Sequence, residues 1–144
     1  MTNQNSKDIL IVGVGGQGTL LASRILGNLA ISQGHDVKLS EVHGMAQRGG
    51  SVVTHVRYGS KVFAPTVDAG SADIIIAFEK LEALRWIGKL KPNGKMFVNT
   101  QEIAPMPVVT GAMEYPSDIE GKIAAEVPGT VFVDALKFAK EAGN

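Results

Sequence analysis

The first forty residues change their hydrophobic pattern twice. Ile9 to Val12, followed by Val14, form a continuous apolar run, typical of a strand that is covered on both faces of a parallel sheet. From Gly18 to Gln33 the apolar residues follow a helical period, in two neighbouring stripes formed by Leu21, Ile25 and Leu29 and by Ala22, Leu26 and Ala30. Residues 36–42 then alternate as a second strand. The pattern predicts a strand, a helix packed on the sheet and a second strand joined by a right-handed crossover.

The rest of the chain continues in short strands and helices. The predicted strands are 51–58, 61–64, 72–78, 95–99, 108–109 and 130–134, and the predicted helices are 79–90, 118–126 and 135–142. Gly59 and Ser60 form a tight turn between the first two of these strands, and 91–94 form another turn. The stretch 100–116 contains three prolines and is expected to be largely irregular. The fold class is therefore α/β, a three-layer αβα, Rossmann-like single domain with a mixed, mostly parallel sheet.

Composition narrows the class of protein. The chain has 144 residues, 44% hydrophobic and 19% charged, which suits one globular domain. Its 14 basic and 14 acidic side chains cancel, so no overall field attracts nucleic acid or an anionic membrane. Residues 1–7 are polar, without the order of a secretory signal, and are expected to be disordered. No apolar stretch approaches the roughly 20 residues of a membrane helix. We therefore expect a cytoplasmic protein with no nucleic-acid or membrane partner.

The chain contains no cysteine. Disulfides are excluded, and so is any zinc site or iron–sulfur cluster held by thiolates of this chain alone.

A glycine-rich turn follows the first strand. Gly13, Gly15 and Gly18 match G-x-G-x-x-G between a strand and a helix, where unpaired amides at the helix N-terminus can bind an anion. Glu41 ends the second strand, about where an acidic residue holds the ribose of a dinucleotide. The residues alone are compatible with a nicotinamide or flavin site, or with close packing of helix on strand and no ligand. Gln17 is expected at the rim of the turn, facing whatever docks there.

The loop after the second strand is the other candidate for chemistry. His43 to Ser51, HGMAQRGGS, lies beyond the carboxyl end of its strand, the edge where open α/β sheets bind ligands. Arg48 can form two charge-assisted hydrogen bonds to a phosphate or a carboxylate, and the loop glycines allow backbone amides to converge. This loop and the glycine turn are expected to share one crevice.

Other polar residues carry weaker signals. His55 and His35 are expected to be structural or solvent-facing, and Ser51 and His55, about 13 Å apart along a strand, are too distant for proton transfer. Glu41 and Glu79 end strands that are expected to be neighbours, so they are candidates for a carboxylate pair in the crevice.

The two motifs together carry a resemblance. GVGGQG, followed by EVHGMAQRGGSVVTHVRYG, is similar to the gamma subunit or domain of the 2-oxoacid:ferredoxin oxidoreductases, and most similar to the beta subunit of the indolepyruvate type. The similarity extends from Asp8 to the end and includes ADIIIAFEKLEALR and LKPNGKMFVNT. Members of that family usually continue past the point where this chain ends. The resemblance therefore implies that a carboxyl-terminal helical segment is missing, which would expose apolar surface on the final strand and helix.

The resemblance implies a complex that oxidatively decarboxylates a 2-oxoacid to an acyl-coenzyme A and passes electrons to ferredoxin. Thiamine diphosphate and iron–sulfur clusters are then expected on partner subunits, coenzyme A is the co-substrate, and this chain completes the crevice and is not active alone. No catalytic or metal-binding residue is assigned to it. The expected coenzyme A site consists of Gly13, Gly15, Gly16, Gln17, Gly18, His43, Gly44, Gln47, Arg48, Gly49, Gly50 and Ser51. The alternative is an independent NAD(P)-binding reductase of Rossmann type.

Overall fold

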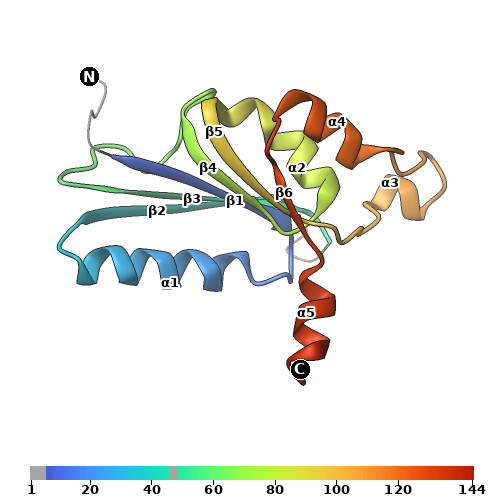
Figure 1. The fold of residues 1–144 in the computed structure, drawn as a ribbon, viewed down its shortest axis with the longest axis horizontal. Coiled ribbons are helices and arrows are strands. Elements are labelled where there is room, and N and C mark those ends of the chain that lie inside the picture. Colours follow the sequence, from blue (N-terminus) through green and yellow to red (C-terminus); the bar gives the residue numbers. More distant parts are fainter. Residues whose placement is uncertain (1–5, 46–48) are drawn as a thin grey trace.

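A computed structural model describes residues 6–45 and 49–144 of the chain. Its strands form one six-stranded sheet in the order β2-β3-β1-β4-β5-β6 (Figure 1). The strands are β1 Lys7–Val14, β2 Asp36–His43, β3 Ser51–Gly59, β4 Ala72–Ala77, β5 Leu90–Asn99 and β6 Val131–Val133. The helices are α1 Thr19–Ser32, α2 Lys80–Trp86, α3 Met106–Val109, α4 Ile119–Glu126 and α5 Ala135–Glu141, with a short 3₁₀ turn at Ile87–Lys89.

The strand directions confirm the mixed, mostly parallel sheet. β1, β4, β5 and β6 pair in parallel, whereas β3 pairs antiparallel with both β1 and β2. β2 therefore runs in the same direction as β1 but is separated from it by β3. The crossover from β1 through α1 to β2 is present, and it spans a strand that enters the sheet later in the chain.

Helices cover the two faces of the sheet unequally. α1 lies below β1, β2 and β3, and α2 and α4 lie above the other half of the sheet, which confirms the three layers (Figure 1). β1 supplies both cores because its side chains alternate between the faces. Leu10 and Val12 join the core with Ile119 and Ile123 of α4, and Ile9 and Ile11 join the core packed against α1.

α1 faces the sheet with only one of its two predicted stripes. Ala30 is buried and Ala22 and Leu26 pack on the core, but Leu21, Ile25 and Leu29 are 65%, 59% and 54% exposed. The helix comes close to the sheet through small residues: a Cβ at Gly27 would lie 3.2 Å from Leu39 Cδ1. The expectation that the Leu21 stripe packs on the sheet is wrong, because small side chains occupy the contact surface instead.

Three predicted segments differ in the structure. Residues 61–64 are not a strand, because their backbone groups bond to side chains: Arg57 donates to the Ala64 carbonyl and Asp36 accepts from the Val62 amide. The predicted turn at 91–94 lies within β5, where the register with β4 shifts and Asn93 has a φ of 65°. The predicted strand 108–109 is instead part of α3, which follows Pro105.

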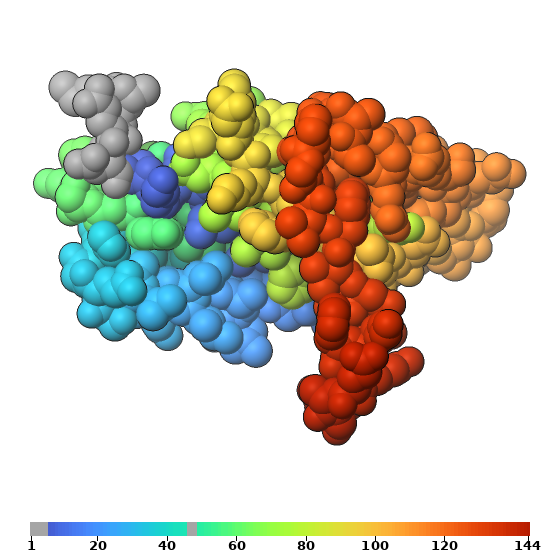
Figure 2. Space-filling view, viewed as in Figure 1, coloured from blue at the N-terminus to red at the C-terminus, as the bar shows by residue number. Residues whose placement is uncertain are grey.

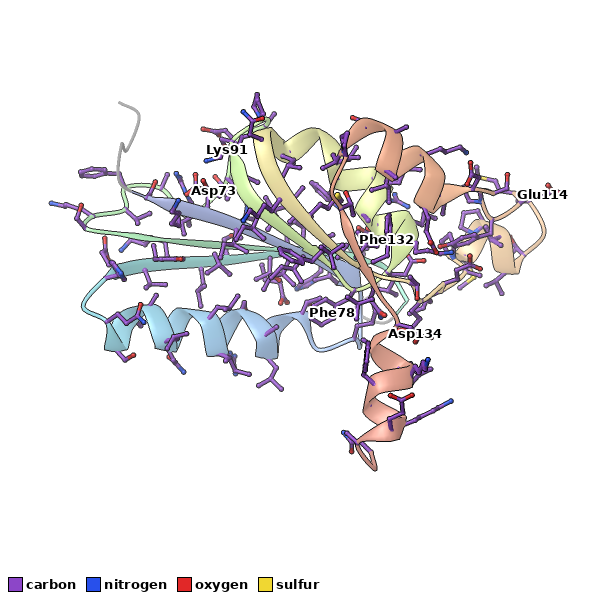
Figure 3. All side chains as sticks on the ribbon, in the orientation of Figure 1. Asp73, Phe78, Lys91, Glu114, Phe132 and Asp134 are labelled. Carbon is purple, nitrogen blue, oxygen red and sulfur yellow. The ribbon has the colours of Figure 1, made fainter. Side chains whose placement is uncertain are left out.

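An ion-pair cluster fixes the amino-terminal ends of the central strands. Arg57 of β3 forms a two-pronged pair with Asp8 of β1, at 2.8 and 3.0 Å. Asp73 accepts from the Asp8 amide and from Lys91. The side chains of Asp73 and Lys91 lie close together at one end of the sheet in Figure 3. β1 begins at Lys7, so the expectation that 1–7 is disordered is wrong for that residue. Residues 1–5 lie outside the described residues.

α5 stands away from the body of the molecule (Figure 2). Leu136 and Phe138 on this helix and Val131 on β6 are half or nearly half exposed. Beside α5, an apolar hollow of about 230 Å³ lies over β4, β5 and β6 between Phe78, Phe97 and Val133. The final strand and helix thus expose apolar surface, as expected from the sequence.

Candidate functional site

The turn between β1 and α1 uses its glycines for two different purposes. Gly13 is buried, and a Cβ there would lie 2.9 Å from Gln17 Oε1 and 3.1 Å from Phe78 Cβ, so it serves close packing. Gly16 and Gly18 have φ angles of 99° and 87° and are exposed. Gly18 is the N-cap of α1 and provides no side chain to the first-turn amides, which lack partners within the helix. These amides form the positive end of a 14-residue helix.

The side chain of Gln17 points into the protein. Its Oε1 accepts from the Val14 amide at 2.8 Å, and its Nε2 donates to the Phe78 carbonyl at 2.9 Å and to Gln101 Oε1 at 3.1 Å. The expectation that Gln17 faces a docked ligand from the rim is therefore wrong. Its amide instead closes the glycine turn and fastens it to the carboxyl ends of β4 and β5.

The two predicted loops do lie side by side. The Gly15 amide donates to the Gly50 carbonyl at 2.9 Å, and the Gly49 amide reaches the Gly15 carbonyl at 3.5 Å. β3 makes this contact possible because it returns from the second loop directly beside β1. Val14 and Ser51 are opposite each other in the ladder.

A small polar pocket opens next to this contact, and we call it the glycine-loop pocket. It measures about 240 Å³ and is lined by Gly15, Gly16, Gly18, Thr19, Leu20, Glu41, His43 and Val52. His43 is exposed, and its Nδ1 lies 3.1 Å from the Gly44 carbonyl. Glu41 lies in the pocket wall, near the place expected for a residue that binds the ribose of a dinucleotide. Its strand, β2, is not adjacent to β1, because β3 lies between them.

A larger cavity also borders the loop contact, and we call it the apolar cavity. It measures about 760 Å³. Gly49, Gly50 and Ser51 form one wall, α2 forms a second, and residues 103–109 with Met113, Glu114 and Pro116 form the third. Most of its lining is aliphatic or thioether, as in many binding cavities.

The predicted site residues are thus divided between several environments. Gly15, Gly16, Gly18 and His43 line the glycine-loop pocket, whereas Gly49, Gly50 and Ser51 line the apolar cavity. Gly13 and Gln17 act inside the fold, and Gly44 is exposed next to His43. Gln47 and Arg48 lie outside the described residues, so their roles stay predictions.

Glu79 joins two walls of the cavity, a role that no sequence pattern indicates. It is 1% exposed, caps α2 by accepting from the Glu82 amide, and also accepts from the Ile103 amide and the Tyr115 hydroxyl. Burial and the hydrogen bond to Glu79 raise the pKa of Tyr115 well above its usual value. Glu79 therefore ties α2 to the irregular stretch after β5. It does not meet Glu41, because two strands separate β2 from β4, so the expected carboxylate pair is absent.

Glu82 links the predicted loop to α2. It is 4% exposed and accepts from Ser51 Oγ at 2.5 Å, and Arg85 Nε lies 3.3 Å from its other oxygen. The Ser51 hydroxyl is therefore engaged by its own chain. A serine followed by a buried carboxylate 31 residues later gives no periodic signal, so sequence reasoning missed the contact.

His55 and His35 have structural roles, as expected from the sequence. His55 is buried in β3 and its Nδ1 accepts from the Val67 amide at 2.9 Å, which is a structural role. Burial, with the positive charges of Lys89 and Arg57, lowers its pKa. His35 packs beside Tyr58 with ring centres 5.5 Å apart. Within residues 6–45 and 49–144, no group of three or more His, Cys, Asp or Glu residues is placed to hold a metal ion.

The described part of the chain also contains no helix with the length and apolar character needed to cross a bilayer.

Solved structures with the same fold belong to oxidoreductases. The pyruvate oxidoreductase subunit PORC of Thermotoga maritima aligns with a TM-score of 0.66 at 18% identity, over 96% of this chain and 67% of that one. The gamma subunit of a keto/oxoacid ferredoxin oxidoreductase from Geobacter sulfurreducens aligns with a TM-score of 0.61 at 21% identity, over 94% and 66%. These similarities confirm the fold.

Two curated relatives are much closer in sequence. The indolepyruvate oxidoreductase subunits IorB of Thermococcus kodakarensis and Pyrococcus horikoshii are 47% and 46% identical, each over 95% of this chain and 69% of the relative. The family model described as pyruvate ferredoxin/flavodoxin oxidoreductase matches residues 8–144. With the paired glycine loops on the α/β scaffold, this match confirms the resemblance, and the chain belongs to the pyruvate ferredoxin/flavodoxin oxidoreductase family.

Proposed function

We propose that this chain is the small subunit of an indolepyruvate-type 2-oxoacid:ferredoxin oxidoreductase, where it completes the active-site crevice and assists the binding of coenzyme A. The IorB relatives, at 46–47% identity, support the type of complex. The observation that supports the role of this chain is the direct contact between Gly15 and Gly50, which brings two glycine loops around one pocket.

The redox chemistry belongs to other chains in this proposal. The sequence has no cysteine to hold an iron–sulfur cluster. It also lacks a GDG segment, the usual beginning of a metal site for thiamine diphosphate. Thiamine diphosphate and the clusters are therefore assigned to partner subunits, which supply decarboxylation and electron transfer. The role left to this chain is to bind, orient and enclose.

The glycine-loop pocket suits one phosphate group. The first-turn amides of α1 lack helical partners, and Gly16 and Gly18 leave the approach to them open. Glu41 lies in the same pocket, and its negative charge reduces the affinity for anions. We therefore assign this chain a shared part of the coenzyme A site, with further cations supplied by Arg48 or by the partner.

An independent NAD(P)-dependent reductase is not favoured. In a dinucleotide-binding unit the acidic residue follows a strand adjacent to the glycine turn. Here β3 lies between β1 and β2 and displaces the strand of Glu41 by one strand spacing, about 4.8 Å. The close relatives are also named as oxidoreductase subunits.

The test places a negative charge inside the pocket. Leu20 lies in the first turn of α1 and lines the pocket, whereas the adjacent Leu21 is 65% exposed and does not. Glutamate in the first helical turn is compatible with α1, so Leu20→Glu is expected to fold. In the complex reconstituted with its thiamine-dependent subunit, we expect KM for coenzyme A to rise about tenfold, on the order of 1.4 kcal/mol.

The matched control is Leu21→Glu, which adds the same charge one residue away. Its KM for coenzyme A is expected to stay within about twofold of the wild-type value. Equal KM values for coenzyme A in both variants would show that coenzyme A does not bind in this pocket. Turnover of a 2-oxoacid by the isolated chain with NAD(P) would refute the subunit role.

A further inference from the structure

The stretch between β5 and α4 combines an open apolar cavity with exposed apolar side chains. Met106, Val109 and Met113 are 68%, 66% and 64% exposed, and all three line the apolar cavity. They belong to the stretch between β5 and α4, which forms the outermost part of the molecule near the labelled Glu114 in Figure 3. Thioether side chains adapt to the shape of a partner and are common at docking surfaces.

The same stretch carries an excess of negative charge. Residues 100–129 contain five carboxylates against a single basic residue, although the whole chain has a net charge of zero. The carboxylates are Glu102, Glu114, Asp118, Glu120 and Glu126, and the basic residue is Lys122. Lys80 neutralises part of this charge through ion pairs with Glu102 and Glu120. Among the described residues, no ion pair engages Glu114, which lies in the cavity lining.

Hydrogen bonds hold the third wall of the cavity against α2. Glu79 holds both sides of the third wall, through the Ile103 amide at 3.1 Å and the Tyr115 hydroxyl at 2.5 Å. Pro105, Pro107 and Pro116 restrict the backbone between and beyond these points. A surface that is already ordered loses little conformational entropy on binding. The backbone that carries the exposed apolar rim is therefore held in place, while the methionine side chains on it can still adapt.

The charged groups also indicate which occupant fits. Arg85 is the cation in the described lining, and it already pairs with Glu82. The lining therefore has an excess of carboxylates, which disfavours acidic ligands and nucleic-acid phosphates. An apolar group accompanied by positive charge satisfies both the lining and its surroundings.

We propose that the apolar cavity is a docking site for the thiamine-dependent partner subunit, which inserts an apolar or aromatic side chain flanked by lysine or arginine. This inference rests on the proposed function for the identity of the partner. It goes beyond that function by assigning the contact to the β5–α4 stretch, away from the glycine-loop pocket.

The test changes one rim residue and compares it with an apolar residue elsewhere that is also more than half exposed. Met113→Lys removes an apolar contact and adds a charge that repels a basic partner. Leu29→Lys makes the same kind of change on α1, at a side chain 54% exposed. The Kd of each variant for the purified thiamine-dependent subunit is measured by calorimetry. We expect Met113→Lys to raise Kd at least tenfold and Leu29→Lys to change it less than twofold.

A second pair of variants separates charge from apolar contact. Glu114→Lys reverses the charge at the cavity, and Glu141→Lys reverses a charge on α5. We expect only Glu114→Lys to weaken binding, by about threefold to tenfold, with a smaller effect at high salt because screening removes the charge contribution. The melting temperature of each variant identifies any loss of folding.

The outcomes distinguish this inference from the proposed function. If Met113→Lys and Leu29→Lys bind the partner equally well and both complexes turn over substrate, the docking site is wrong while the proposed function stands. If the wild-type chain neither binds that subunit nor supports turnover, both are wrong. Self-association of the wild-type chain that Met113→Lys abolishes would identify a second copy as the occupant and overturn the proposal.

Discussion

At the scale of single residues, the direction of a side chain decides its role more than its chemistry does. Gln17 was recognised from the sequence as a hydrogen-bonding residue in the glycine turn. Its hydrogen bonds to Val14, Phe78 and Gln101 all remain inside the chain. Two of these partners are more than 60 residues away, so no local pattern contained this information.

A change of Gln17 to glutamate tests its internal role. The carboxylate can still accept from the Val14 amide, but it then faces two acceptors, the Phe78 carbonyl and Gln101 Oε1. The ionised form is disfavoured, so the pKa of the new acid is raised in the folded state and stability is lost as the pH rises. We expect Gln17→Glu to lose about 1–3 kcal/mol at pH 7.5 and less at pH 5, measured by urea unfolding.

Asn28→Asp provides the control, since it is the same amide-to-acid change on the exposed side of α1. The stability of Asn28→Asp relative to the wild type should not be lower at pH 7.5 than at pH 5. Equal losses in the two variants at both pH values would contradict the internal role of Gln17.

At the scale of elements, periodicity predicted the buried strands and longer helices, and it failed where tertiary contacts decide the conformation. β1, β4 and α1 were located within about two residues because their apolar runs are continuous or helical. The stretch 61–64 alternates like a strand but bonds to the side chains of Arg57 and Asp36. The sheet order also lay beyond the pattern, because nothing local indicates that β3 enters between β1 and β2.

The candidate site was also predicted only in part. The proximity of the two glycine loops was predicted correctly, because the carboxyl ends of strands at one edge of a sheet are close in space. The cavity wall at 103–116 was described only as irregular. It depends on Glu79, whose buried contacts with Ile103 and Tyr115 come from residues 24 and 36 positions away.

α5 provides a prediction about the stability of one element. The helix has seven residues and no buried side chain, and Asp134 caps it by accepting from the Lys137 amide at 3.0 Å. A helix this short is marginal without support, so its cap matters. Asp134→Ala should cost about 1 kcal/mol locally and accelerate hydrogen exchange of the 138–142 amides about fivefold, as measured by mass spectrometry.

Exchange in β1 and β4 should stay unchanged in the same experiment, because α5 adds little to the common core. Asp68→Ala is the control. Ser71 donates to the backbone carbonyl of Asp68, and alanine keeps that carbonyl. Acceleration throughout the sheet would show that α5 unfolds together with the whole molecule.

At the scale of the whole molecule, the main ion pairs and the candidate sites lie at opposite ends of the sheet. The ion pairs of Asp8, Arg57 and Asp73 fix the ends where the parallel strands begin. The glycine-loop pocket and the apolar cavity lie at the ends where those strands finish. The loops at the candidate sites can therefore vary without loss of the ion pairs that hold the other ends of the strands together.

One buried imidazole makes the stability of the whole domain depend on pH. The folded-state pKa of His55 lies below its ordinary value near 6.5, mainly because of burial. The unfolded chain then binds a proton more readily, so folding is favoured above pH 6.5 and stability is lost as the pH falls below it. We expect the free energy of unfolding to decrease more between pH 7.5 and pH 5 in the wild type than in His55→Gln.

The glutamine can still accept a hydrogen bond from the Val67 amide but does not titrate. Urea unfolding of both proteins at a series of pH values gives the difference directly. Parallel stability curves would mean that His55 makes no contribution to the pH dependence.

The inserted strand β3 sets the spacing between the two loops. Val52 pairs with Gly13 on one side and with His43 on the other. A slip of two residues would keep every side chain on its own face of the sheet, but it would separate Arg57 from Asp8 and carry Gly50 about 6.6 Å away from Gly15. The ion pair of Asp8 and Arg57 at one end of the sheet therefore keeps the two glycine loops at the other end in register, as a clamp on one end of two parallel rods aligns their tips.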